Sequence, residues 1–157
     1  MAGAGKSTIG RKLAELLEFN FLDGDVMIEE KINQSIQSFL DQYGGKEFTK
    51  IEEQVLLSID LNKTVLATGG SAVLSDAAMN FLKKESEVIF LDVSYENISE
   101  RILNLSERGL VREPYQSLQD TYNQRLKLYQ KYADHIVINN EDTKSCLKRL
   151  KLLLENF

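Results

Sequence analysis

The chain has 157 residues, of which 43% are hydrophobic and 27% charged, a composition typical of one soluble globular domain. Twenty-four acidic against 19 basic residues give a net charge of −5, which argues against a nucleic-acid-binding surface. The single cysteine, Cys146, excludes an internal disulfide, and no apolar stretch approaches the roughly 20 residues that span a bilayer. We therefore expect one cytoplasmic domain, 1–157, that acts as a monomer without nucleic acid or membrane.

The chain begins with the second half of a Walker A loop, whose full pattern is G-x-x-x-x-G-K-[ST]: Met1-Ala2-Gly3-Ala4-Gly5-Lys6-Ser7-Thr8. Gly3 and Gly5 let backbone amides approach phosphate oxygens closely. Lys6 can reach the β- and γ-phosphates of a nucleotide, and Ser7 can ligate Mg²⁺ through its hydroxyl. A glycine-rich turn before an ordinary helix is the alternative. The segment Gly3 to Thr8 predicts binding of a nucleoside triphosphate.

The loop lacks the strand that precedes it in related folds. That strand normally lies near the centre of a parallel sheet, buried on both faces. Either the working protein is longer at its N-terminus, or another segment takes the place of the strand. We expect the first, a chain truncated inside the Walker A loop.

Short apolar strands alternate with helices along the rest of the chain. Apolar patterning and turn residues predict strands at 20–23, 64–67, 87–93 and 135–138. They predict helices at 6–18, 25–41, 46–60, 75–84, 95–105, 117–133 and 143–155, with a polar loop at 106–116. This order predicts a three-layer α/β fold, a parallel sheet with helices on both faces and ligands at the carboxyl ends of the strands.

Two carboxylates, Asp23 and Asp25, follow the first visible strand. Beside a triphosphate site, one can hold the Mg²⁺ shell and the other can accept a proton from a substrate hydroxyl. Helix capping is the alternative, because aspartate is a favoured N-cap and a helix is predicted from residue 25. The neighbouring phosphate loop favours the functional interpretation.

Other candidate residues follow the later strands. Gly69 and Gly70 end the second strand and let backbone amides approach a ligand, although a tight turn would use them too. Arg125 lies on a helix, where a guanidinium can bind a carboxylate bidentately, although its spacing alone would leave it at the surface. His135 opens a strand without an evident acid or base partner, so we interpret it as structural.

The charged loop 106–116 contains Arg108 and Arg112. A mobile loop with an arginine can cover the phosphates, stabilise charge on the transferring group and exclude water. A solvated surface loop is the alternative, which we prefer for Arg112.

Taken in order, the motifs resemble the shikimate kinase family over essentially the whole chain. The family patterns are a P-loop, D-T-D, F-R-x-x-E, G-G-G, an R-P-L lid and R-x-x-L-Y. The matching segments are Gly3 to Thr8, Asp23-Gly24-Asp25, Phe48 to Glu52, Gly69-Gly70-Ser71, Arg108-Gly109-Leu110 and Arg125 to Tyr129. The resemblance implies a P-loop fold with a parallel five-stranded sheet, the first strand being absent from this chain, and a mobile lid at about 106–116. It implies ATP-dependent phosphorylation of shikimate, a step of aromatic amino acid biosynthesis.

The resemblance also implies roles for residues on the nucleotide side. Lys6 and Arg108 would contact the transferred phosphate of ATP. Ser7 would ligate Mg²⁺, and Asp23 would hold metal-bound water. Arg101 would pack on the adenine ring.

On the acceptor side, the resemblance implies that Asp25 orients and helps deprotonate the attacking hydroxyl. Gly69 and Gly70 would offer amides to the substrate beside Ser71. Arg125 would pair with the substrate carboxylate. Lys6, Asp25 and Arg108 would therefore be the catalytic residues.

The departures from the family cluster on the acceptor side. Thr49 stands where the family has a second carboxylate-binding arginine, and neighbouring Lys50 would face elsewhere. Ser71 replaces the third glycine, and Gly109 replaces the lid proline. The alternatives are therefore a kinase for another small acceptor, such as homoserine or gluconate, and a nucleotide-binding regulatory module without turnover.

Overall fold

Helices and short strands alternate along the chain, as the sequence predicts. The computed structural model describes residues 1–103, 111–112 and 115–154. The strands are β1 (Asn20–Asp23), β2 (Thr64–Ala67), β3 (Ile89–Asp92) and β4 (His135–Ile138). The helices are α1 (Lys6–Leu17), α2 (Gly24–Ile32), α3 (Ile36–Leu57), α4 (Asp76–Glu85), α5 (Tyr95–Leu103), α6 (Leu118–Tyr132) and α7 (Thr143–Leu154), with a short 3₁₀ turn, η1 (Ala72–Leu74).

The four described strands form two parallel pairs. Asn20 in β1 is in register with Thr64 in β2, and Ile89 in β3 with His135 in β4. Between β2 and β3, an apolar cavity of about 390 Å³ is lined by residues of both strands and of α1. The described residues therefore establish parallel pairing, and the continuous five-stranded sheet stays a prediction.

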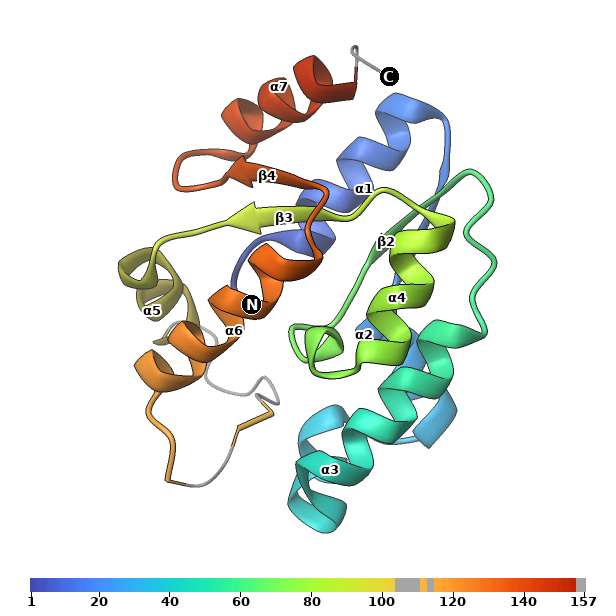
Figure 1. Ribbon diagram of the computed structural model, residues 1–157, viewed down its shortest axis with the longest axis vertical. Helices are drawn as coiled ribbons and strands as arrows, with labels where there is room; N and C mark the ends of the chain where they lie inside the picture. Colours follow the sequence, from blue (N-terminus) through green and yellow to red (C-terminus); the bar gives the residue numbers. More distant parts are fainter. Residues whose placement is uncertain (104–110, 113–114, 155–157) are drawn as a thin grey trace.

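Helices pack on both faces of the strands (Figure 1). On one face, Ile9 and Leu13 of α1 join Cys146 and Leu150 of α7 in a buried cluster with Val137 of β4. On the other face, α6 crosses β3, where the Tyr129 ring stacks on Phe90 with centroids 5.2 Å apart. A larger core, which includes Phe48 and Leu56, joins α2, α3, α4 and α6. The layered α/β arrangement agrees with the sequence prediction.

The helix predicted at 25–41 is in fact two helices. Asn33 adopts a left-handed conformation with φ of 53°, which ends α2. Ser35 then begins α3 by accepting a hydrogen bond from the Ser38 amide at 3.2 Å. The predicted break near Gly44 is a kink inside α3, where this residue has φ of 78° and ψ of 171°.

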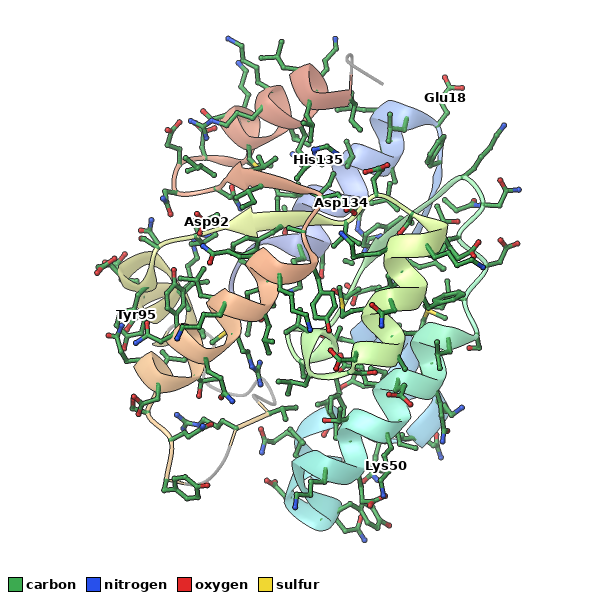
Figure 2. The ribbon with its side chains drawn as sticks, in the orientation of Figure 1. Glu18, Lys50, Asp92, Tyr95, Asp134 and His135 are labelled. Carbon is green, nitrogen blue, oxygen red and sulfur yellow. The ribbon has the colours of Figure 1, made fainter. Side chains whose placement is uncertain are left out.

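The third strand is shorter than the predicted 87–93, because its partner β4 has only four residues. Beyond the paired region, the Val88 amide donates to the Asp134 side chain at 2.9 Å. Figure 2 shows Asp92 at the carboxyl end of β3, and Asp134 and His135 at the opposite end of the pair. His135 contacts Glu87 there at 3.2 Å, consistent with a structural role.

Candidate active site

The phosphate loop, the ends of β1 and β2, and α6 line one cavity of about 620 Å³. Most of the predicted site residues line it: Gly3, Gly5, Lys6, Ser7, Thr8, Asp23, Asp25, Gly70, Ser71, Arg101 and Arg125. Ala4 is buried in the loop, and Gly69 lies beside Asp25 and Glu52. Arg108 lies outside the described residues, as does most of the predicted lid. The structure therefore brings the two predicted halves of the site together.

Two glycines give the phosphate loop its tight turn, because both have left-handed backbone conformations: Gly3 with φ of 73° and Gly5 with φ of 86°. Gly5 is the residue that caps α1, so the helix begins at Lys6 with its N-terminus at the cavity. The Lys6 ammonium donates to the Met1 carbonyl at 2.8 Å. A wound loop at a helix N-terminus, with a lysine and the Ser7 hydroxyl, is suited to bind phosphate.

Asn139 and Arg101 hold this loop in place through hydrogen bonds to its carbonyl groups. Asn139 is buried, and its side-chain amide donates to the Ala4 carbonyl at 2.8 Å. The Arg101 guanidinium donates to the carbonyls of Gly3 at 3.2 Å and Asn139 at 3.3 Å. The sequence analysis missed Asn139. This polar residue directly follows the last strand, and the other candidates were found because they follow the carboxyl ends of strands.

Asp23 and Asp25 line the same cavity, and Asp23 also caps a helix. The Asp25 amide donates to Asp23 Oδ1 at 3.1 Å, so the capping interpretation of Asp23 is correct in structural terms. Within the described residues, no group of three His, Cys, Asp or Glu could hold a metal. A site with Ser7 and Asp23 still fits Mg²⁺, because this ion is usually held by few protein groups together with phosphates and water.

Arg125 is buried at the α6 side of the cavity, rather than exposed as its spacing alone indicated. It is 3% exposed, and its guanidinium donates to the carbonyls of Gly70, at 3.2 Å, and Val111. The Tyr129 hydroxyl donates to the same Gly70 carbonyl at 2.7 Å. A buried guanidinium fixed in this way is suited to pair with a carboxylate.

Glu52 lies in the wall behind Ser71, and sequence reasoning gave it no role. It is 1% exposed, and its Oε2 accepts a hydrogen bond from Ser71 Oγ at 2.6 Å. Burial raises the pKa of Glu52 to about 7, even though the Ser71 hydrogen bond lowers it. Its place at the end of the family's F-R-x-x-E motif, matched by Phe48 to Glu52, was the only available sequence signal.

The cation that the family places on α3 has no equivalent here. Thr49 directs its hydroxyl to the Gly45 carbonyl at 2.9 Å, within its own helix. Lys50 pairs with Glu47 at 2.6 Å, and Figure 2 shows it on the outer side of α3. Among the described residues that line the cavity, Arg125 is therefore the one cation on the acceptor side.

Comparisons with known proteins identify relatives of this chain. A family model described as shikimate kinase matches residues 2–154. A shikimate kinase of Haemophilus influenzae is 35% identical over 159 residues, covering 98% of this chain and 88% of that protein. The structure of a shikimate kinase from Acinetobacter baumannii in complex with shikimate has a TM-score of 0.86 at 34% identity, covering 98% and 89% of the two chains. This chain therefore belongs to the shikimate kinase family.

Proposed function

We propose that this protein transfers the terminal phosphoryl group of ATP to a hydroxyl of shikimate, forming shikimate 3-phosphate. One observation supports it above the others: the phosphate loop, Asp25 and the buried Arg125 line a single cavity. That cavity can accept a nucleotide and a small acid together. The solved relative with bound shikimate supports the choice of acceptor.

At the phosphate end, Lys6 binds the β- and γ-phosphates and offsets the charge that develops on the transferring group. Ser7 and Asp23 would hold Mg²⁺, Asp23 through water, and the ion would supply positive charge against the phosphates. Arg101 packs on the adenine ring from α5. Arg108, proposed from the family motif alone, contacts the transferred phosphate from the lid at about 106–116.

At the acceptor end, Asp25 takes the proton of the attacking hydroxyl as its oxygen forms the bond to phosphorus. The bond from the γ-phosphorus to the bridging oxygen breaks, and ADP leaves with the electron pair. Gly69 and Gly70 present their amides to the substrate beside Ser71, and Arg125 pairs with its carboxylate. This positioning supplies most of the expected catalysis, because phosphoryl transfer needs little covalent chemistry from the protein.

Another small acceptor is the alternative, because the chain departs from the family at two acceptor-side residues. Thr49 and Ser71 suit an acid that is smaller or less strongly anchored, such as homoserine or gluconate. The non-catalytic alternative is disfavoured by Lys6 and Asp25 in one cavity, since a module that only bound nucleotide would not need Asp25.

We also propose that the protein works as a monomeric single domain in the cytoplasm. The lone cysteine, buried in α7, fits a reducing compartment. Among the described residues, no helix is both long and apolar enough to cross a membrane.

The test is ADP release with Mg-ATP and shikimate in a coupled assay, with Lys6→Ala as the blank and Lys12→Ala, exposed on the same helix, as the matched control. Saturable turnover that Lys6→Ala abolishes and Lys12→Ala keeps would establish the function. ATP binding without turnover on shikimate, homoserine or gluconate would refute it in favour of a regulatory role. Turnover on homoserine or gluconate alone would change the acceptor.

A further inference from the structure

Glu52 is a buried acid that the proposed mechanism does not use. Its Oε2 accepts the Ser71 hydrogen bond, whereas its buried Oε1 has no hydrogen-bond partner among the described residues. An ionised carboxylate in this position would keep a charged oxygen that neither water nor a donor satisfies. A proton on Oε1 would remove that charge and supply a donor.

Charged groups from three helices face Glu52. A Cβ on Gly69 would stand 2.2 Å from Glu52 Oε1 and 2.9 Å from Asp25 Oδ1, so the two carboxylates flank this one glycine. Arg125 on α6 and Lys6 on α1 act on Glu52 as cations, and the Asp25 carboxylate on α2 acts as an anion. Burial, the largest effect, raises the pKa of Glu52 to about 7.

Binding of an acid would disturb this balance of charge. A carboxylate paired with Arg125 would bring a third negative group beside Asp25 and Glu52, and it would occupy the cation that favours an ionised Glu52. No cation on α3 offsets the change, because the Thr49 hydroxyl is bonded to Gly45 and Lys50 is exposed beside Glu47. Protonation of Glu52 is the local response that restores the balance.

We infer that Glu52 is the proton-uptake residue of the acceptor site: it binds one proton from solvent on Oε1 when the acceptor carboxylate pairs with Arg125. Acceptor affinity therefore falls as the pH rises. Glu52 acts as a positioning residue, because it sets the charge of the pocket without touching the reacting atoms. The inference rests on the proposed function, since it requires an acidic acceptor at Arg125.

The test is calorimetric titration of the nucleotide-free protein with shikimate at pH 7.5, in Hepes and in Tris. The difference between the two heats gives the protons bound per shikimate. With a pKa of about 7 in the free protein, we expect uptake of up to about three-quarters of a proton. Glu52→Gln should reduce uptake to near zero, whereas Glu47→Gln, exposed on the same helix, should retain it.

Two further measurements do not depend on the Glu52→Gln protein. The KM for shikimate of the unmodified enzyme should rise about tenfold from pH 7 to 8.5, with little change in kcat. Ser71→Gly removes a hydrogen bond that lowers the pKa of Glu52, so this rise should move to higher pH. Shikimate binding without proton uptake, or uptake that persists in Glu52→Gln, would overturn the inference alone. Failure to bind or phosphorylate shikimate at any pH would refute the proposed function, and the inference with it.

Discussion

The two ends of the cavity are built in different ways. The proposed phosphate end comes from one continuous segment, Gly3 to Thr8, which offers backbone amides and a helix N-terminus to a ligand. The acceptor end consists of single side chains from separate elements, Asp25 on α2, Ser71 after β2 and Arg125 on α6. In the proposed site, phosphate recognition is therefore local to a short segment, whereas acceptor recognition depends on how distant helices pack.

The largest expected effect is that of Asp25→Asn. Loss of the proposed base should lower kcat on the order of 10²- to 10⁴-fold, because the hydroxyl proton loses its acceptor. The KM for ATP should change little, since the phosphate loop is untouched. Steady-state kinetics on both substrates measure this, with Asp41→Asn, an exposed change on α3, as the control. An equal rise in the KM for ATP and in the KM for shikimate would show that the two ends do not act separately.

The second effect is on stability and concerns Glu52→Gln. Burial raises the pKa of Glu52 from 4.5 to about 7 in the folded protein, so the folded state binds this proton more tightly than the unfolded state. Its contribution to stability is complete below pH 4.5 and is lost as the pH rises through 7, a loss of roughly 3 kcal/mol.

Glu52→Gln has no proton to lose at this position, so its stability relative to the unmodified protein should increase from pH 5 to pH 8. Urea unfolding at the two pH values measures the change. If the stability difference between the two proteins were the same at pH 5 and pH 8, Glu52 could not be a buried acid with a raised pKa.

The sequence predicted the order of elements and the glycine-rich turn before α1 well, because both depend on local patterns. The sequence also contains the two signals that end one helix and begin the next. Asn33 can adopt the left-handed conformation of a C-cap, and Ser35 is a favoured N-cap, but the predicted helix 25–41 ignored both. The carboxyl-end rule located Asp25 and Gly70, and it would have located Asn139 had it been applied to the last strand.

The acceptor end was harder to predict because burial is a property of the packed fold. Arg125 looked exposed from its spacing, yet it is 3% exposed because α6 packs where its guanidinium reaches the carbonyls of Gly70 and Val111. Glu52 looked like one of several charges on a helix, and only the fold shows that its Oε1 is buried without a described partner. Apart from the family motifs that contain them, no local pattern distinguishes these residues from solvated ones.

The third prediction concerns Arg125→Lys, which keeps the positive charge and removes the planar fork. Loss of a bidentate pair with the acceptor carboxylate should raise the KM for shikimate at least about 30-fold, roughly 2 kcal/mol, and leave the KM for ATP nearly unchanged. Arg149→Lys, a change at a half-exposed position on α7, is the matched control. An unaltered KM for shikimate would mean that another group binds the carboxylate.

The smallest effect is that of Thr49→Arg, which adds the cation that the family has on α3. Residue 49 lies one helical turn before Glu52, so an arginine there can reach the same wall of the pocket. We expect the KM for shikimate to fall at least about threefold, roughly 0.6 kcal/mol. Its pH dependence should also weaken, because a cation beside Glu52 favours the ionised carboxylate.

Thr49→Gln separates charge from length in this experiment, since it adds a long neutral side chain at the same position. A fall in KM with arginine but not with glutamine would show that the acceptor end lacks only charge, and that one local substitution supplies it. A gain smaller than threefold would mean that Ser71 and Glu52 have reorganised the pocket. In that case Glu52 would already have the Ser71 hydrogen bond and a proton, and would not pair with the arginine. The acceptor end would then differ from the family at several residues that depend on one another.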